Sequence, residues 1–302
     1  MQKGPTTPKG FRDIDPTLAK KKRETINIIA NVLEEFDFVP LETPIIEFAE
    51  TLTGKYGAEE KLIYKFTDRG GRELALRYDL TVPLARYVAN NLNIIAKEPF
   101  SRYQVGESFR GENTQKGRYR EFTQFDMDTV GSTDPKIDAQ AIAAAMTAAR
   151  KLGLKNAKMM INDRTIFDKL GITKDALITM DKIDKIGKEG VLKELKEKNI
   201  KDPEKIFESV EKSEKTENLN KIFEELNKFG FEEDKDFVFA RFLVRGLDYY
   251  TSTVLELKPT GQMEEQSIGG GGRYDDLIGM FAGRKIPAVG FSFGLDRLLE
   301  LL

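Results

Sequence analysis

The stretch PFSRYQVGESFRGENTQKGRYREFTQFDMDTV, residues 99–130, contains two long runs typical of β-strands, separated by a loop rich in glycine and charge. The strand runs cover residues 99–110 and 120–130, and the loop covers residues 111–119. This order predicts an antiparallel hairpin. Strand runs joined by turns, without the regular strand–helix alternation of doubly wound proteins, indicate an α+β fold built on an antiparallel sheet.

Further strand-like runs lie on both sides of this hairpin. Residues 62–66 and 73–79 flank the turn sequence DRGG at 68–71 and predict a second hairpin. Pro83 predicts a helix that follows directly, so that Asp79 and Thr81 stand where a strand ends and a helix begins. Three later runs have the same strand-like composition: residues 237–242, 247–257 and 286–293. The sheet is therefore assembled from both halves of the chain.

Two aspartate–proline pairs predict helix starts. Asp15-Pro16 precedes a run whose apolar residues recur at three- and four-residue steps, and Asp134-Pro135 precedes an alanine-rich run that stops near Gly153. An aspartate N-cap accepts hydrogen bonds from free backbone N–H groups, and proline suits the first helical position. The run KKKR at 20–23 lies on the first of these helices, and we expect it to be a solvated surface without a functional role.

The middle of the chain differs in composition from its ends. Residues 172–235 are rich in lysine, glutamate, aspartate and asparagine, with short amphipathic runs such as LNKIFEELNKFG. Such runs are typical of surface helices. We expect a helical insertion domain at 172–235, which divides a core formed by residues 1–171 and 236–302.

Composition excludes several kinds of chemistry. Because the 302 residues include no cysteine and no histidine, disulfides, thiol nucleophiles, catalytic triads and zinc sites are excluded, and we expect no metal site. No apolar run approaches the ~20 residues that span a bilayer, and MQKGPTTPKGFRD lacks the apolar segment of a signal peptide, so we expect a cytoplasmic protein without a membrane partner. The 48 basic and 50 acidic residues nearly cancel, so nucleic acid would have to bind a local basic patch.

Three arginines and a run of glycines are the candidate chemical groups. Arg110, Arg245 and Arg297 would suit a triphosphate, because guanidinium groups bind phosphate bidentately and keep their charge. Phosphoryl-type displacement needs positioning and charge neutralisation more than a base. Residues 269–272 are four glycines, which we interpret as a turn whose backbone approaches a flat ligand; a flexible loop is the alternative.

Several peptides, in order along the chain, resemble those of one family. FRGENTQKGRYREFTQFDMD at 109–128 looks like motif 2 of class II aminoacyl-tRNA synthetases, and AVGFSFGLDRLLELL at 288–302 looks like their motif 3. RGLDYYTSTVLE at 245–256 and SIGGGGRYDDLIG at 267–279 resemble the two signature peptides of histidyl-tRNA synthetases, and TPKGFRDIDP at 7–16 extends the likeness. The resemblance implies a class II catalytic domain, with motifs 1 and 2 before residue 172, and without the anticodon-binding domain that follows motif 3 in the family.

The resemblance implies roles for side chains that bind ATP. Arg110 and Arg245 match residues at the α-phosphate, and Arg297 matches one at the γ-phosphate. Phe122 matches the residue under the adenine ring, and Glu112 matches one that contacts the adenine amino group. This chain departs from the family in its motif 2 loop, which reads ENTQ where ERPQ is usual.

Other matches concern the amino acid. Three positions match residues around its α-amino group: Asp79, Thr81 and Gln124. Asp128, Tyr250 and Tyr274 match residues that read the imidazole ring, with Asp128 accepting a ring N–H and Tyr274 offering its hydroxyl. Buried acceptors and a phenol can select a ring with two nitrogens, because a wrong ligand leaves them unpaired.

The resemblance therefore implies a homodimeric ligase that activates histidine with ATP and Mg²⁺, uses no prosthetic group, and transfers histidine to tRNA. The dimer would form through the first long helix and the strand after it. One alternative is the synthetase-like regulatory subunit of ATP phosphoribosyltransferase in histidine biosynthesis, and a weaker one is an adenylating paralogue for another amino acid. Arg110, Arg245 and Arg297 favour the enzyme, because a histidine sensor has no need of three cations for a triphosphate.

Overall fold

The computed structural model describes residues 6–114, 117–245, 249–260 and 266–302. Its large sheet has the strand order β1-β5-β6-β11-β10-β9-β7-β8. In that order the strands are Val39–Pro40, Phe100–Phe109, Glu121–Val130, Ala288–Gly294, Gly269–Arg273, Thr253–Lys258, Lys158–Asp163 and Phe237–Phe239. All neighbours from β5 to β7 are antiparallel, whereas the edge strands β1 and β8 pair in parallel. The predicted α+β fold is confirmed. Its edge pairs are parallel because long connections, not hairpin turns, join their strands: residues 41–99 between β1 and β5, and residues 164–236 between β7 and β8.

The hairpin predicted at 99–130 is the longest pair in the sheet. β5 and β6 pair over their full length, with Phe100 opposite Val130 and Phe109 opposite Glu121. The two residues 115–116 of the connecting loop lie outside the described part of the chain. Of the strands predicted near the end, the run at 247–257 gives β9 only from Thr253, and residues 247–248 lie outside the described part.

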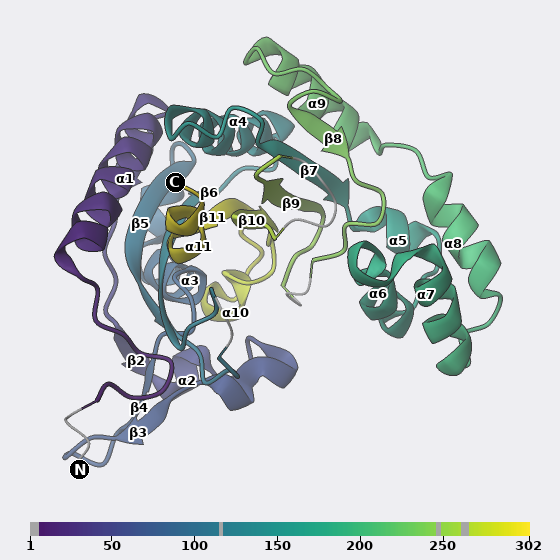
Figure 1. Cartoon of the computed structure of the whole chain (residues 1–302). Helices are drawn as coiled ribbons and strands as arrows, with labels where there is room; N and C mark the ends of the chain where they lie inside the picture. Colours follow the sequence, from purple (N-terminus) through teal and green to yellow (C-terminus); the bar gives the residue numbers. More distant parts are fainter. Residues whose placement is uncertain (1–5, 115–116, 246–248, 261–265) are drawn as a thin grey trace.

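Helices α1, α4, α9 and α11 share one apolar core with the large sheet (Figure 1). They span Pro16–Glu35, Pro135–Lys151, Glu217–Lys228 and Leu295–Leu301. Both predicted helix starts are confirmed: Asp15 Oδ1 accepts hydrogen bonds from the backbone N–H of Thr17, at 2.8 Å, and of Leu18, at 3.1 Å. Asp134 caps α4 in the same way, so local capping signals fix where both long helices begin.

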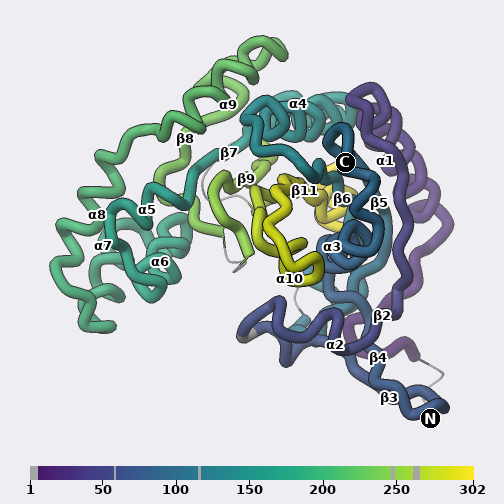
Figure 2. The backbone as a smooth tube through the Cα atoms, turned by 180° about the vertical axis from the view of Figure 1, so that it is seen from behind, coloured from purple at the N-terminus to yellow at the C-terminus, as the bar shows by residue number. Residues whose placement is uncertain are grey.

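A smaller sheet projects from one end of the molecule (Figure 2). Its strands, in the order β2-β4-β3, are Ile46–Phe48, Glu73–Leu76 and Lys65–Thr67, so the predicted second hairpin is confirmed with shorter strands. The short helices around it are α2 Ala49–Leu52, η1 Gly57–Leu62, α3 Thr81–Asn90, η2 Leu92–Ile95 and α10 Gly279–Ala282. These elements share a second core that includes Tyr56, Tyr78 and Tyr274. This core supports one wall of the site described below.

The helical middle of the chain projects from the opposite side (Figures 1 and 2). Helices α5 Thr165–Lys169, α6 Lys174–Met180, α7 Ile183–Glu197 and α8 Pro203–Glu211 enclose their own apolar core. Helix α9 instead packs along α4 and belongs to the core of the large sheet. The limits 172–235 of the insertion domain stay a prediction.

The four glycines at 269–272 form β10, a buried central strand, where we predicted a turn or a loop. Close packing is the physical reason. A Cβ atom on Gly271 would lie well inside 3.0 Å of the Gly290 carbonyl oxygen on β11, and one on Gly270 would meet the guanidinium of Arg245. Glycine is required here because other strands and a side chain occupy the space a Cβ would need.

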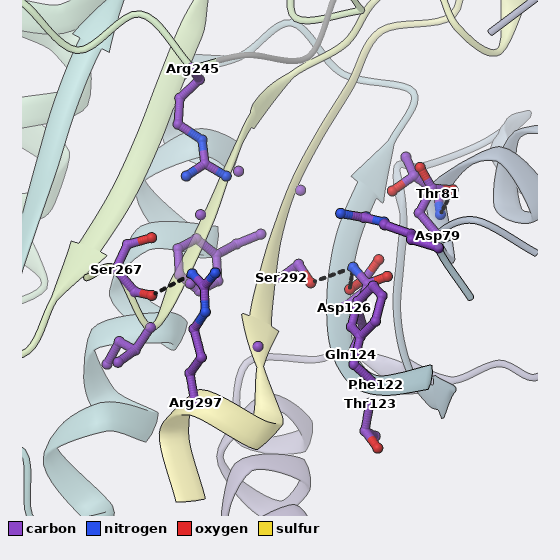
Figure 3. Close-up of a pocket in the computed structure, with 18 of the residues that line it drawn as sticks. Asp79, Thr81, Phe122, Thr123, Gln124, Asp126, Arg245, Ser267, Ser292 and Arg297 are labelled. Carbon is purple, nitrogen blue, oxygen red and sulfur yellow. Dashed lines mark hydrogen bonds between the residues drawn. The ribbon is translucent and has the colours of Figure 1, made fainter. Parts of the chain in front are cut away.

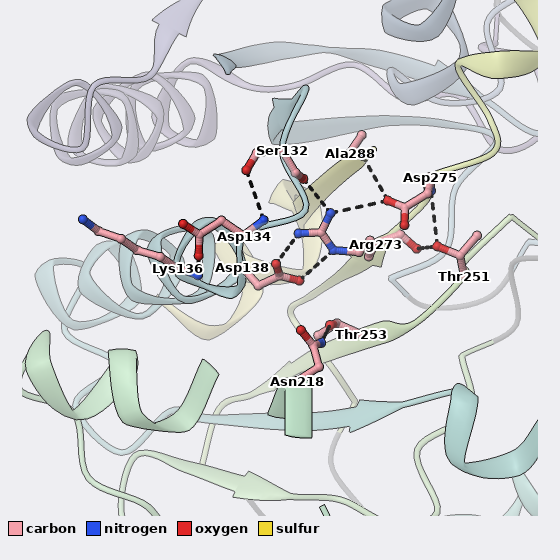
Figure 4. Close-up of polar contacts among 10 residues, drawn as sticks. All are labelled: Ser132, Asp134, Lys136, Asp138, Asn218, Thr251, Thr253, Arg273, Asp275 and Ala288. Atoms are coloured by element: carbon pink, nitrogen blue, oxygen red, sulfur yellow. Dashed lines mark hydrogen bonds and ion pairs between the residues drawn. The ribbon is translucent and has the colours of Figure 1, made fainter. Parts of the chain in front are cut away.

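Arg273 anchors the end of β10 to helix α4 (Figure 4). Its Nε donates to Asp138 Oδ1 at 3.2 Å, and its Nη1 donates to the Ser132 carbonyl oxygen at 2.8 Å. Asp138 and Arg273 are both buried, so each charge is neutralised by its partner. The strand next to the cavity is thus held from the helix side.

Within the described ranges, no helix has both the length and the apolar character needed to cross a membrane.

Gly271→Ala tests the close packing of β10. The added methyl group meets backbone atoms of β11, which cannot rotate away, so we expect a loss of about 3 kcal/mol or more in the free energy of unfolding, at the upper end for overpacked cores. Urea unfolding followed by circular dichroism measures it. Gly70→Ala, in an exposed turn, is the control and should change stability by less than about 0.5 kcal/mol. Equal stabilities of the two variants would contradict the packing account.

Candidate active site

A cavity of about 330 Å³ lies over the centre of the large sheet. Its lining includes every residue predicted for a site: Asp79, Thr81, Arg110, Glu112, Phe122, Gln124, Asp128, Arg245, Tyr250, Tyr274 and Arg297. These residues come from both halves of the chain, and β6, β10 and β11 bring them together. The structure therefore places all of these residues around one cavity, and their roles stay predictions.

Asp79 is fixed by the start of helix α3. Its Oδ1 accepts hydrogen bonds from the backbone N–H of Thr81, at 3.1 Å, and of Val82, at 3.0 Å. The Tyr56 hydroxyl donates to the same oxygen at 3.0 Å. Burial raises the pKa of Asp79, and these hydrogen bonds oppose the shift. The carboxylate thus caps a helix and also faces the cavity.

Asp126 and Asp128 extend the acidic end of the cavity from strand β6. The Tyr274 hydroxyl donates to Asp128 Oδ1 at 2.5 Å, and Arg102 Nη2 lies 2.7 Å from Asp128 Oδ2. Burial, and then the neighbouring carboxylate of Asp128, raises the pKa of Asp126 to about 7. Burial also raises the pKa of Asp128, although Arg102 opposes the shift. This end of the cavity is suited to a cationic ligand or to N–H donors.

Gln124 adds an acceptor beside the carboxylates. Its Nε2 donates to Ser292 Oγ at 3.0 Å, so the orientation of the amide is set from β11. Its Oε1 is buried and has no hydrogen-bond partner among the described residues. A buried acceptor without a partner costs free energy, which a donor on a ligand would recover.

Arginines gather at the other end of the cavity. Figure 3 shows Arg245 and Arg297 on one side and Asp79, Gln124 and Asp126 on the other. Burial, followed by the charges of Arg118 and Arg245, lowers the pKa of Arg297, which reflects how closely the guanidinium groups approach one another. Arg297 Nη1 donates to the Ser267 carbonyl oxygen at 3.3 Å. Such a group of cations suits a polyphosphate.

The charge of Arg110 acts on Asp79 at one end of the cavity and on Arg297 at the other. Arg110 Nε donates to the Tyr78 carbonyl oxygen at 3.1 Å, directly before Asp79 in the chain. The carbon of its guanidinium lies 4.3 Å from the centre of the Tyr78 ring and 4.9 Å from that of Phe122. Two aromatic rings and a backbone carbonyl therefore orient this cation before any ligand binds.

Arg245 has an unusual backbone. Its φ of 58° is in the left-handed region, which costs free energy for a residue other than glycine. Its Nη1 lies 3.7 Å from Glu256 Oε1, and its guanidinium lies over Gly270. Residues 246–248 of the RGLDYY peptide lie outside the described part of the chain.

The segment before α1 reaches the cationic end, which sequence reasoning missed. Arg12 pairs with Asp296, next to Arg297, and lies over the Tyr119 ring at 3.7 Å. Asp296 Oδ2 in turn accepts a hydrogen bond from the Thr123 backbone N–H at 2.8 Å. Arg12 lies in the quoted TPKGFRD peptide, but nothing in its local pattern indicates this distant contact.

The run KKKR at 20–23 differs from prediction at Lys22. Lys22 Nζ donates to Thr123 Oγ1 at 2.7 Å and lies 3.6 Å from Glu107, so this side chain is not simply solvated. Thr123 lines the cavity. Asp126, Tyr249 and Asp296 also line it, and the predicted set of site residues did not include them.

Carboxylates of the described residues form no group of three or more that could hold a metal ion.

A family model described as histidyl-tRNA synthetase matches residues 10–231 and 180–298 of the chain. A protein named histidine–tRNA ligase from Aeropyrum pernix is 41% identical over 328 aligned residues, which cover 98% of this chain and 74% of that protein. One from Nanoarchaeum equitans is also 41% identical, over 97% of this chain and 73% of that protein.

Solved structures agree on the fold. The crystal structure of histidyl-tRNA synthetase from Nostoc sp. PCC 7120 superimposes with a TM-score of 0.85 at 30% identity, over 98% of this chain and 75% of that one. A structure from Bacillus halodurans C, titled as an ATP phosphoribosyltransferase regulatory subunit/histidyl-tRNA synthetase, gives a TM-score of 0.82 at 24% identity, over 98% of this chain and 83% of that one. At that identity the second likeness concerns the fold alone.

The pH dependence of stability tests the acidic end. The pKa of Asp126 is about 7 in the folded protein and ~3.9 for an unperturbed aspartate, so the folded state binds the proton more tightly. Its contribution to stability is complete below about pH 4 and is lost as pH rises through about 7. Relative to wild type, Asp126→Asn should therefore gain on the order of 2–4 kcal/mol in unfolding free energy between pH 4 and 8.

Urea unfolding at a series of pH values measures this gain. Asp68→Asn is a control of opposite sign, because hydrogen bonds from Arg72 lower the pKa of the exposed Asp68 carboxyl, so that its small contribution is lost as pH falls. If the difference in unfolding free energy between Asp126→Asn and wild type did not change with pH, the raised pKa of Asp126 would be contradicted.

Proposed function

Because the chain belongs to the histidyl-tRNA synthetase family, we propose that it activates histidine with ATP and transfers the histidyl group to tRNA. In the first step a carboxylate oxygen of histidine attacks the α-phosphorus of ATP, and the bond to pyrophosphate breaks. Histidyl-adenylate forms and pyrophosphate leaves with the electron pair. In the second step a hydroxyl of the terminal adenosine of tRNA attacks the acyl carbon, and AMP leaves.

The observation that carries this proposal is the charge separation inside one cavity. Asp79 and Asp126 lie on one side and Arg245 and Arg297 on the other, and the charge of Arg110 acts on both Asp79 and Arg297. Histidine has an ammonium group and a ring N–H, and ATP has a polyphosphate. Placed with complementary charges, the two substrates meet near Arg110, where the new bond between carboxylate and α-phosphate has to form.

Histidine binds at the acidic end. Asp128 accepts a ring N–H, and the Tyr274 hydroxyl and Tyr250 complete the ring pocket. The 2.5 Å hydrogen bond from Tyr274 to Asp128 supports this role, because it holds the carboxylate in place before the ring enters. Three residues receive the α-ammonium group: Asp79, Thr81 and Gln124. An apolar amino acid would leave these buried groups unpaired, and such a mismatch discriminates strongly.

ATP binds at the cationic end. Arg110 and Arg245 neutralise the α-phosphate as charge builds in the transition state, and Arg297 binds the γ-phosphate. The adenine ring lies against Phe122, and Glu112 accepts a hydrogen bond from its amino group. The stacking of Arg110 on Phe122 supports this arrangement, because it puts the α-phosphate ligand next to the adenine platform.

Mg²⁺ belongs to the substrate, as the MgATP complex. Arginines of the protein neutralise the α-phosphate, because guanidinium groups bind phosphate bidentately and keep their charge. Arg245 is suited to this, because Gly270 leaves room for its guanidinium against the strand.

The test of the function is histidine-dependent exchange of pyrophosphate into ATP, measured without tRNA. We expect exchange with histidine and none with other amino acids. A protein that binds histidine but catalyses no exchange would favour the alternative role of a regulatory subunit of ATP phosphoribosyltransferase. The three arginines favour the enzyme, since a histidine sensor does not need a triphosphate site.

Arg245→Lys tests the role of this cation in the transition state. Lysine keeps the charge but loses the bidentate fork, so we expect the rate of histidyl-adenylate formation to fall by roughly 10²-fold, the scale of losing one preorganised donor. Histidine binding should change little. Single-turnover adenylation with histidine titrated measures both quantities.

Two further variants make this result specific. Arg241→Lys, at an exposed arginine whose Nε donates to the Ser213 carbonyl oxygen, should keep the wild-type rate. Tyr250→Phe should weaken histidine binding while leaving the rate with bound histidine closer to normal. An Arg245→Lys protein with the unaltered rate would remove this arginine from the mechanism.

A homodimer and a cytoplasmic location are further parts of the proposal. Ile46, Phe48 and Phe66 form an exposed apolar patch on one face of the small sheet, because Phe48 and Phe66 both pair with Leu74 and Ile46 precedes Phe48 by two residues. Exposed apolar patches of this kind mark protein–protein contacts. Val39 is also exposed, and it lies on β1, the strand after α1 that belongs to the dimer interface expected from the sequence.

Phe48→Glu tests this interface. Phe48 is 52% exposed, so a charge there should not disturb the fold but should oppose burial in a partner. We expect wild type to sediment as a dimer at micromolar concentration and Phe48→Glu to sediment as a monomer. Met280→Glu, at an apolar residue that is 57% exposed on α10, is the control and should remain dimeric. A monomeric wild type would refute the proposed dimer.

A further inference from the structure

Arg102 is a charged residue that the mechanism above does not use. It lies near the start of β5, is 0% exposed, and stands opposite Asp128 in the register of β5 and β6. Its Nη2 lies 2.7 Å from Asp128 Oδ2 and donates to the Leu80 carbonyl oxygen at 3.2 Å. A fully buried arginine is rare and costly unless its charge is paired, so its position calls for a reason.

The two contacts of Arg102 join the two halves of the amino-acid pocket. Asp128 belongs to the half that reads the ring. Leu80 lies between Asp79 and Thr81, which belong to the half around the α-amino group. Both contacts are made by the same nitrogen, Nη2, while the buried Nε and Nη1 have no hydrogen-bond partner among the described residues. A rigid, planar guanidinium holds this nitrogen at a fixed place between the two halves, whereas a lysine ammonium on a flexible stem does not.

The charges that face Asp128 explain why a cation is needed there. Asp126 approaches from β6, Asp79 from the start of α3, Tyr274 from the end of β10, and Tyr250 from the segment before β9. Neighbouring carboxylates disfavour each other's ionisation, and burial adds to this effect. A protonated Asp128 would present a donor to the ring nitrogen instead of an acceptor. The contact with Arg102 opposes that change.

We propose that Arg102 is a positioning residue for histidine specificity, which holds Asp128 as an ionised acceptor at a fixed distance from the Asp79–Thr81 segment. The inference rests on the proposed function, since it concerns recognition of histidine in that same pocket. Arg102 is not among the residues that line the cavity, so we expect no direct contact with histidine. Its effect passes through Asp128 and the Leu80 backbone, and it concerns histidine affinity and its pH dependence, not the affinity for ATP.

Titration calorimetry with histidine, from pH 5.5 to 8.5 and without ATP, tests the proposal. Arg102→Met removes the cation, so we expect histidine affinity at pH 7 to fall by about 100-fold, the scale of a buried carboxylate without its partner. The pH below which binding weakens should rise by about one unit, because Asp128 then takes up a proton more readily. The KM for ATP in the exchange reaction should stay within about twofold of wild type, since the cationic end is unchanged.

Two other variants separate positioning from a general loss of stability. Arg150→Met is the matched control, because Arg150 also pairs with a buried carboxylate, Asp236, far from the cavity. It should lower the melting temperature and leave histidine affinity and its pH profile unchanged. Arg102→Lys keeps the charge and loses the rigid, planar guanidinium. It should keep the wild-type pH profile with about tenfold weaker affinity, and it decides the matter if Arg102→Met does not fold.

The outcomes distinguish this inference from the proposed function. The positioning role would be overturned, and the function left intact, if Arg102→Met bound histidine with the affinity and pH profile of wild type. If Arg102→Met does not fold, wild-type histidine affinity in Arg102→Lys would overturn the role instead. A wild-type protein that binds no histidine would overturn the proposed function, and the inference with it.

Discussion

Opposite charges held apart within one buried cavity are the constraint on which the rest of the site depends. Removing a carboxylate or guanidinium from water costs several kcal/mol, so each charged group must find partners in the protein or in the ligand. The carboxylates have such partners in the protein: Asp79 accepts from helix N–H groups, and Asp128 contacts Tyr274 and Arg102. The arginines at the far end have fewer protein acceptors, and a polyphosphate would supply them.

The glycines of β10 allow the acidic and cationic groups to lie at opposite ends of one cavity. Gly270 leaves room for the Arg245 guanidinium against β10, and the absent side chain of Gly290 leaves room for the Asp128 carboxylate against β11. Arg273 holds the same strand to α4 from behind. At these glycines the backbone of β10 and β11 is in direct contact with the side chains of Arg245 and Asp128. Backbone packing, and not the glycines' flexibility, therefore defines the cavity.

Local signals predicted the fold well where local chemistry decides it. The caps at Asp15 and Asp134 begin α1 and α4 as expected, because an N-cap is satisfied within its own turn. Residues 269–272 were predicted as a turn or loop, because strand propensity is absent from glycine and tertiary packing alone makes β10.

The sequence motifs contain the residues that line the cavity, and the roles predicted for these residues come from family resemblance. Arg12 and Arg102 could not be found in this way, since their partners Asp296 and Asp128 are distant in the chain and the pairs form only in the folded protein.

The central claim is the orientation of the two substrates. A crystal structure with a non-hydrolysable histidyl-adenylate analogue tests it most directly. The account predicts a ring nitrogen within hydrogen-bond distance of the Asp128 carboxylate and the phosphate-like group between Arg110 and Arg245; an imidazole at the arginine end, or a phosphate-like group beyond reach of both arginines, would contradict it.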